Sequence, residues 1–302
     1  MRNLLTLAMG ASLLLLGQVS LAATDGARPL QSRPELCGRD LLAAIPARPA
    51  NAPGGREFAR QVWSLSGPVR DALIVTQLEA GNIPPFLRHL IPVTVRGETP
   101  HGAVHITVCV LPDYLAVGSD TDFLYVPLGL KAALAVAARF GDVLPTPKLV
   151  DAIYAASPVK LVPEPLTASD AMRSTAYVLR HTELIDLQRA LSRQPLGTLT
   201  SGDKKDLVLT DRLWEAPGRV AIYGWQRASG RPIQPLSTVH GERYADYSHG
   251  IRLVSRVVYV NGVARGMDDV LADSNLAPLL SREGRLRDVS ARLATLAAGF
   301  GT

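Results

Sequence analysis

Strand-like segments lie on both sides of a helical stretch in this chain, and this order constrains its fold most. The strand patterns cover Ile91–Val95, Val104–Leu111, Tyr114–Val117, Phe123–Val126, Leu207–Leu209, Val220–Trp225 and Ile251–Val260. Turn residues such as Pro112-Asp113 separate the first group, which predicts antiparallel hairpins. Strands, then helices, then strands predict an α+β fold with a largely antiparallel sheet and packed helices, in a single large domain.

The helical patterns lie mainly between these strands. They cover about 56–65 and 68–80, Leu128–Phe140, a segment that opens at Pro147, and a longer helix that Ser169 would cap. That longer helix carries His181 on its apolar face, which predicts a core histidine. From Met267 on, the pattern predicts short helices and a basic amphipathic tail.

The N-terminus has the pattern of a secretory signal peptide. Met1-Arg2-Asn3 precedes an apolar run from Leu4 to Leu16, and small residues around Ala22 form a cleavage site. The run is too short to cross a bilayer, and no later segment approaches about 18 continuous apolar residues. We therefore expect a signal peptide at 1–22 and a secreted or periplasmic protein without a transmembrane span. An irregular Pro/Gly-rich arm is expected at 23–55 and a globular domain at 56–302, with 195–200 as an alternative internal boundary.

The formal charge of the chain is +5, and its basic residues are scattered. The longest basic run is Lys204-Lys205, and no basic stripe is interleaved with aromatic residues. This pattern argues against nucleic acid as a partner. A mild attraction to acidic envelope polymers is compatible with it.

The chain has two cysteines, Cys37 and Cys109. In an oxidising compartment they can form one disulfide, which would tie the N-terminal arm to the sheet. Cys109 could instead be a free buried thiol or a catalytic one. For catalysis its nearest histidine in sequence is His105, and four residues of strand separate the two by about 13 Å. That separation is too long for a Cys–His pair.

Polar groups gather between Ser201 and Gly250. One cluster, Ser201–Asp206, precedes a strand, and a second, Val239–Gly250, precedes the next. Loops on a rigid scaffold often carry catalytic groups. General acid–base catalysis by His240 and His249 is one prediction, because the pKa of histidine lies near neutrality. The carboxylates that could orient these histidines are Asp203, Asp206 and Asp246.

Two other chemistries, and a structural role, fit the same residues. A divalent metal such as zinc could bind His240, His249 and Asp203, since two histidines and a carboxylate are a hydrolytic zinc pattern. Nucleophilic catalysis could use Ser248, or Ser201 in the pattern Ser201-x-x-Lys204. The pattern Ser157-x-x-Lys160 matches equally. In the structural alternative, these polar groups only bond each other and the backbone.

The string Ser248-His249-Gly250-Ile251-Arg252 resembles the Ser-His-Gly-Cys-Ile-Arg signature of L,D-transpeptidases, which crosslink peptidoglycan. His240-Gly241 is similar to the upstream His-Gly of that family. The nucleophilic cysteine of the signature is missing here, so the resemblance does not imply the thiol mechanism. The stretches Gly81–Pro84, Leu144–Lys148 and Tyr244–Val254 also resemble exported bacterial proteins of unassigned function.

Together these patterns predict an exported hydrolase-like enzyme rather than a transferase. Its substrate would be an envelope or extracellular polymer, or a small molecule, and it would act through a His/Asp site. Lys204 or Lys205 would bind an anionic group, and Tyr223, Trp225 and Tyr247 would form a stacking wall. The alternative is a non-catalytic envelope-binding protein of the same architecture.

Overall fold

The structure is a computed structural model that describes residues 34–38 and 44–298, all within one compact unit. The predicted signal peptide, and the parts of the predicted arm at 23–33 and 39–43, lie outside the described residues. From residue 44 to Pro53 the arm is irregular, as predicted. Arg48 anchors it by donating from Nε to Asn82 Oδ1 at 2.9 Å and to the Gly118 carbonyl at 2.8 Å. The described residues show no division near 195–200.

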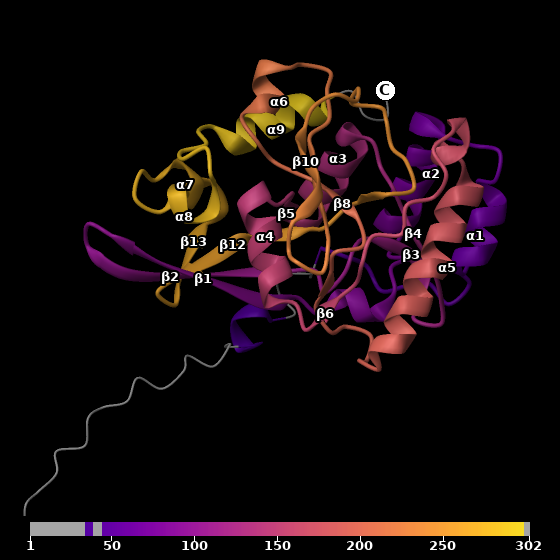
Figure 1. The fold of residues 1–302 in the computed structure, drawn as a ribbon, viewed down its shortest axis with the longest axis horizontal. Coiled ribbons are helices and arrows are strands. Elements are labelled where there is room, and N and C mark those ends of the chain that lie inside the picture. The colour runs from indigo at the N-terminus through magenta and orange to yellow at the C-terminus, as the bar shows by residue number, and fades with distance from the viewer. Residues whose placement is uncertain (1–33, 39–43, 299–302) are drawn as a thin grey trace, which may run out of the picture. The chain divides into compact units, whose positions relative to one another are not determined.

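The larger sheet joins strands from both ends of the sequence. Its members are β1 (Ile91–Thr99), β2 (Gly102–Val110), β5 (Asp142–Val143), β12 (Val254–Val260) and β13 (Val263–Gly266). The order is β1-β2-β12-β13, with β5 paired to β12, and every pairing is antiparallel. Figure 1 shows β1 and β2 as a long hairpin. The predicted α+β class with mainly antiparallel pairing is therefore confirmed.

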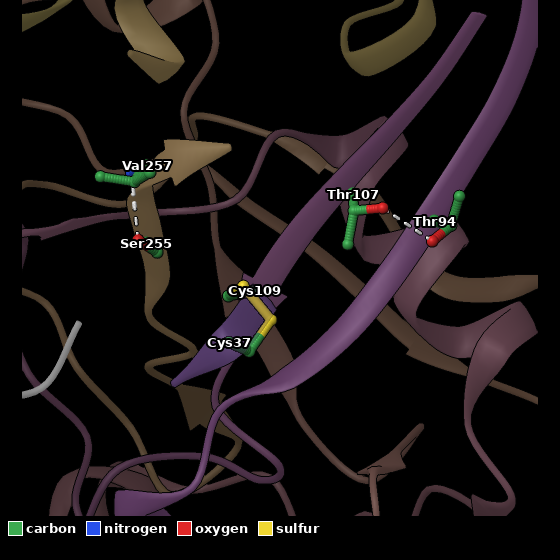
Figure 2. Close-up of a disulfide and its surroundings, with 6 residues drawn as sticks. All are labelled: Cys37, Thr94, Thr107, Cys109, Ser255 and Val257. Atoms are coloured by element: carbon green, nitrogen blue, oxygen red, sulfur yellow. Dashed lines mark hydrogen bonds between the residues drawn. A yellow bond between two sulfur atoms is a disulfide. The ribbon is translucent and has the colours of Figure 1, made fainter. Parts of the chain in front are cut away.

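Two side-chain contacts mark the register of this sheet (Figure 2). Thr94 and Thr107 lie opposite each other, with their hydroxyls 3.0 Å apart. In β12 the register shifts between Val254 and Val258, and the Ser255 hydroxyl accepts the Val257 N–H at 3.0 Å. A hydroxyl that accepts a backbone N–H compensates for the ladder bond that such an irregularity removes.

A smaller sheet carries the polar segments. Its strands are β8 (Lys205–Leu207), β9 (Ile222–Gln226), β10 (Pro232–Ser237) and β11 (His249–Gly250), in the order β10-β9-β8-β11. β8 and β11 are parallel, and the other pairs are antiparallel. Two further pairs are the hairpin of β3 (Ala116–Ser119) with β4 (Asp122–Tyr125), and β6 (Val159–Lys160) beside β7 (Thr200–Ser201). The predicted strand at Ile251–Val260 is shorter in the structure and begins at Val254, because Ile251–Leu253 has no ladder partner.

The helices begin and end close to the predicted signals. They are α1 (Gly55–Gln61), α2 (Gly67–Glu79), α3 (Leu130–Phe140), α4 (Pro147–Ala156), α5 (Thr175–Ser192), α6 (Arg212–Glu215), α7 (Met267–Ala272), α8 (Ala277–Leu280) and α9 (Val289–Ala297). Gly141 ends α3 with a φ of 77°, a left-handed conformation that glycine adopts without strain. Short 3-10 helices are η1 (Pro34–Cys37), η3 (Pro85–Arg88) and η4 (Asp170–Arg173). Figure 1 shows α5 beside α1, far from the β1–β2 hairpin.

The predicted start of the long helix is wrong by several residues. Ser169 caps η4 by accepting the Ala171 N–H, and α5 begins at Thr175 with Ser174 as its cap. The Ser174 hydroxyl accepts the Tyr177 N–H at 3.3 Å. Two serines in suitable positions give two short-range cap signals, and the sequence pattern does not say which of them opens the longer helix.

The disulfide is formed between Cys37 and Cys109 (Figure 2). Their Cα atoms are 5.5 Å apart, and the bond ties η1 to the C-terminal end of β2. This confirms the disulfide among the three roles considered for these cysteines, and it excludes Cys109 as a catalytic thiol. Within residues 34–38 and 44–298, helices that combine the length and the apolar character needed to cross a bilayer are absent.

Candidate functional site

The two polar segments meet, as the hypothesis of a site required. β8 and β11 lie side by side in parallel, and Lys205 is opposite His249. The Lys205 N–H donates to the Ser248 carbonyl at 2.8 Å. Segments about forty residues apart in sequence are thus fixed by backbone hydrogen bonds rather than by side chains alone.

Asp246 is the centre of the resulting cluster. Its carboxylate is buried, and its Oδ1 accepts the Ser248 N–H at 2.8 Å and the Ser248 hydroxyl at 2.6 Å. Its Oδ2 accepts the Tyr244 hydroxyl at 3.1 Å. Three donors on one carboxylate stabilise its charged form. Although burial opposes this, the charge of His249, the bonds from Ser248 and the nearby charge of Lys205 hold the pKa of Asp246 at about 2.

His249 lies next to Asp246 in the interior. Its Nε2 is 4.0 Å from Asp246 Oδ2, and neither ring nitrogen has a hydrogen-bond partner among the described residues. Burial lowers the pKa of His249 to about 4, although the charge of Asp246 acts in the opposite direction. His249 is therefore neutral near pH 7. Because its side chain is buried, a large substrate cannot contact it directly.

His240 is the accessible histidine. Its ring stacks on the Tyr244 ring with a centroid separation of 4.0 Å, and it lies 6.3 Å from the His249 ring. Burial and the charge of Lys205 lower the pKa of His240, while Asp246 raises it. Burial, with the charge of Asp246, raises the pKa of Tyr244 to about 12, so its hydroxyl keeps its proton. Both predicted histidines and one predicted carboxylate, Asp246, are thus brought together.

An open hollow of about 460 Å³ lies beside this cluster. Tyr244 lines it together with Arg173, Gly218, Gly241, Glu242 and Arg243. Tyr244 therefore links the hollow to the buried Asp246 through its hydroxyl. The Arg173 guanidinium is 5.5 Å from the centre of the same ring.

The other two predicted carboxylates belong to a second, fully buried cluster. Asp206 accepts the Tyr114 hydroxyl at 2.9 Å and lies 3.9 Å from the Arg252 guanidinium. Asp203 has no hydrogen-bond partner among the described residues, and burial raises its pKa to about 7. Burial also raises the pKa of Asp206 to about 7. Neither contacts a histidine of the site, so the prediction that they orient His240 and His249 is not supported.

Lys204 belongs to the same buried cluster. The prediction that it binds an anionic group of the substrate is therefore wrong. The side chain is fully buried, and its Nζ donates to the Tyr247 carbonyl at 2.7 Å and lies 3.0 Å from His181 Nδ1. Burial lowers the pKa of Lys204 to about 8. His181 is buried on α5, as predicted for a core histidine. Lys205, in contrast, is partly exposed and lies 5.0 Å above the Trp225 ring.

The predicted stacking wall is packed into the protein. Trp225 and Tyr247 are buried with their rings 6.5 Å apart, and the Tyr247 hydroxyl accepts the Leu166 N–H at 2.7 Å. Tyr223 points elsewhere, because its hydroxyl donates to Asp151 at 3.0 Å beside a different hollow. All three rings pack in the hydrophobic core instead of forming a wall at the site.

The metal and serine alternatives gain no support from the geometry. In residues 34–38 and 44–298, no three His, Cys, Asp or Glu side chains are arranged to hold a metal ion, and the charged neighbours of Asp203 belong to a different cluster from His240 and His249. Ser248 is fully buried and donates to Asp246. Ser201 is buried as well, and its hydroxyl donates to Ser157 at 2.9 Å rather than pairing with Lys204.

Three residues of the site were not singled out from sequence. Tyr244 lies inside the predicted polar cluster, but nothing local shows that its hydroxyl reaches Asp246. Arg243 is next to it. Arg173 ends η4, about seventy residues earlier, and reaches the hollow because the Tyr247 N–H donates to the Met172 carbonyl at 3.1 Å. That tertiary contact has no signal in the sequence.

Comparison with known proteins leaves the site to be interpreted on its own geometry. The sequence matches no family model, no curated protein and no solved structure. Where the L,D-transpeptidase signature has its cysteine, this chain continues from Gly250 directly to the buried Ile251.

Proposed function

We propose that this protein is an exported hydrolase-like enzyme that cleaves an envelope or extracellular polymer, with His240 as its acid–base group and Asp246 as the carboxylate that stabilises the charged form of His240. The observation that carries the proposal is the ionised Asp246, which is held by Ser248 and Tyr244. The Tyr244 ring lines an open hollow and stacks on the half-buried His240. A buried carboxylate next to an accessible imidazole is a typical arrangement for general base catalysis.

The proposed reaction is attack of water on the polymer bond. Neutral His240 takes a proton from the water as its oxygen bonds to the electrophilic centre. The imidazolium that forms is stabilised by the negative charge of Asp246, which acts on the His240 pKa in that direction. His240 then returns the proton to the leaving group as its bond breaks. Tyr244 holds the His240 ring by stacking, and Ser248 holds Asp246 in place.

Substitution of the two proposed groups tests this function. Purified wild-type protein is incubated with peptidoglycan, a polyuronate and a neutral glucan, and released fragments are quantified by mass spectrometry. We expect His240→Gln and Asp246→Asn each to lower the rate of release by at least about a hundredfold, because acid–base catalysis typically contributes that much. The wild-type rate should fall with decreasing pH below the ordinary pKa of histidine, since protonated His240 cannot accept a proton.

The matched control is His101→Gln, which changes an exposed histidine in the turn of the β1–β2 hairpin. It should leave the rate unchanged. Circular dichroism of each variant would show that the fold is retained. Full activity in folded His240→Gln, or no fragments from any polymer with the folded wild type, would overturn the proposal.

The second candidate is a non-catalytic protein that binds an envelope polymer. The observation that favours it is the open form of the hollow, which exposes two arginines and a tyrosine while His249 is enclosed. This candidate predicts polymer binding without fragment release and no effect of His240→Gln on binding. The same assay, read with and without product, separates the two candidates.

A further inference from the structure

We infer that the hollow beside Tyr244 binds a negatively charged unit of the substrate, a carboxylate or phosphate carried on a polymer. This inference rests on the proposed function, because it names the substrate class of the same site. It is argued from charge and from the construction of the hollow, not from the acid–base groups.

The charges that line the hollow do not cancel. Arg173 and Arg243 are exposed, and within the described part of the chain neither guanidinium lies within 4.0 Å of a carboxylate. Glu242 is the acidic residue of the lining. It forms an ion pair with Lys131, which does not line the hollow and whose Nζ is 3.2 Å from Glu242 Oε1. The two arginines are thus left with a positive field and free donors.

A third guanidinium lies below the surface and holds the backbone of Arg173. Arg70 on α2 is buried and donates from Nη1 to the Arg173 carbonyl at 2.9 Å. Its Nε and Nη2 have no hydrogen-bond partner among the described residues. Burial raises the pKa of the neighbouring Asp71 to about 6, so this carboxyl is still largely ionised near pH 7 and offsets much of the charge of Arg70.

The backbone around the hollow is fixed from several directions. The Glu242 N–H donates to the Gly218 carbonyl at 2.8 Å, and the Glu242 carbonyl accepts the Leu130 N–H at the start of α3 at 2.7 Å. A side chain at Gly129 would lie 2.9 Å from the Glu242 carbonyl oxygen, so this close approach depends on glycine. The Tyr244 N–H donates to the Gly241 carbonyl at 2.9 Å. Arg173 and Arg243 therefore project from anchored backbone.

This arrangement selects an anion rather than a neutral ligand. A guanidinium offers paired N–H donors that match the oxygens of a carboxylate or phosphate, and such charge-assisted bonds are stronger than neutral ones. Tyr244 adds a ring against which a sugar could pack. An anionic unit in the hollow would lie next to Tyr244 and so near His240, which would place the following bond of the polymer within reach of the base.

Direct binding tests the inference without an activity assay. Trigalacturonate and inorganic phosphate are titrated into wild-type protein by calorimetry, with chitotriose as the neutral probe. We expect at least one anionic probe to bind about tenfold or more tightly than chitotriose, and the affinity to fall with added salt. Arg173→Gln and Arg243→Gln should each weaken that binding by about tenfold. The probe that binds more tightly identifies the anionic group.

Arg231→Gln is the matched control, since Arg231 lines the other open hollow with Tyr223 and Asp151. It should leave the affinity unchanged. Equal binding of chitotriose, or unchanged affinity in both arginine variants, would overturn the inference. If binding depends on the arginines but no polymer is cleaved, the proposed function fails and the anion site stands. If polymers are cleaved but charge has no effect, the anion site alone fails.

Discussion

Removing the disulfide by changing both Cys37 and Cys109 to alanine is expected to lower the free energy of unfolding by about 4 kcal/mol. The bond closes a loop across a sequence separation of 72 residues, and it limits the conformations open to the unfolded chain. In the chain-entropy model a loop of this length gives about that stabilisation. The loop contains α1, α2 and β1, so the bond links η1 to a sheet whose first strand lies inside the loop.

Equilibrium unfolding in urea, with and without dithiothreitol, measures this effect. Cys109 is fully buried, so the reductant acts on the wild type once the chain opens. We expect reduced wild type to approach the stability of the double variant, and the variant itself to be insensitive to the reductant. Equal free energies of unfolding for the oxidised wild type and the variant would show that the bond adds no net constraint.

The regular elements were predictable where a local signal was strong. The apolar run before Gly141 and the proline at the start of α4 gave helices whose bounds differ little from the structure. The alternating residues of β1 and β2 gave a hairpin. In each case the periodicity and the end signals lie within a few residues of each other, so no distant contact is needed to interpret them.

The polar cluster Ser201–Asp206 shows where such local reasoning fails. Its composition is typical of an exposed loop, yet Asp203, Lys204 and Asp206 are buried. Buried charge is tolerated only when partners from elsewhere compensate it. Here the partners are Tyr114 and Arg252 for Asp206, and His181 and the Tyr247 carbonyl for Lys204. None of them lies within twenty residues, so the composition of the segment alone predicts the opposite exposure.

The strand register explains why Asp206 does not lie beside His249. Lys205 pairs with His249 and Asp206 with Gly250, so side chains of successive residues leave β8 on opposite faces. A shift of one residue would have exchanged these positions. The proximity of Asp246 to His249 does not depend on the register, because the two residues are three positions apart on the same segment. The short-range part of the site was therefore predictable, and the part that depends on register was not.

Replacing Asp142 by asparagine is expected to stabilise the protein strongly at alkaline pH and little at acidic pH. Asp142 lies on β5, and neither of its carboxylate oxygens has a hydrogen-bond partner among the described residues. It borders a small cavity of about 60 Å³ beneath α9, together with Leu293 and Ala297. Burial raises its pKa to about 8, although the charge of Arg256 opposes the shift. The folded protein thus holds this carboxyl in its neutral form.

The direction of the pH effect follows from that raised pKa. Below about pH 4, near the ordinary value of 3.8, Asp142 is protonated in both folded and unfolded chains, and its stabilising contribution is fully present. As pH rises from there to about 8, the unfolded chain releases the proton and the folded chain keeps it. Stability is lost by about 1.4 kcal/mol per pH unit in that window. Asparagine cannot ionise, so the variant avoids this loss.

Urea unfolding of wild type and Asp142→Asn at several pH values between 4 and 9 tests this, with the difference between the two curves as the readout. The difference should be small near pH 4, grow by several kcal/mol in total, and level off above about pH 8. Glu79→Gln, at an exposed position on α2, is the control and should give a nearly constant difference. The protection of α9 amides from exchange, relative to their intrinsic rate at each pH, should fall in the wild type above pH 8 and be retained in Asp142→Asn, because an ionised carboxylate beneath the helix would draw water into its contact with α3. A pH-independent difference for Asp142→Asn would mean that the carboxyl is already ionised in the folded protein and that Arg256 compensates for its burial.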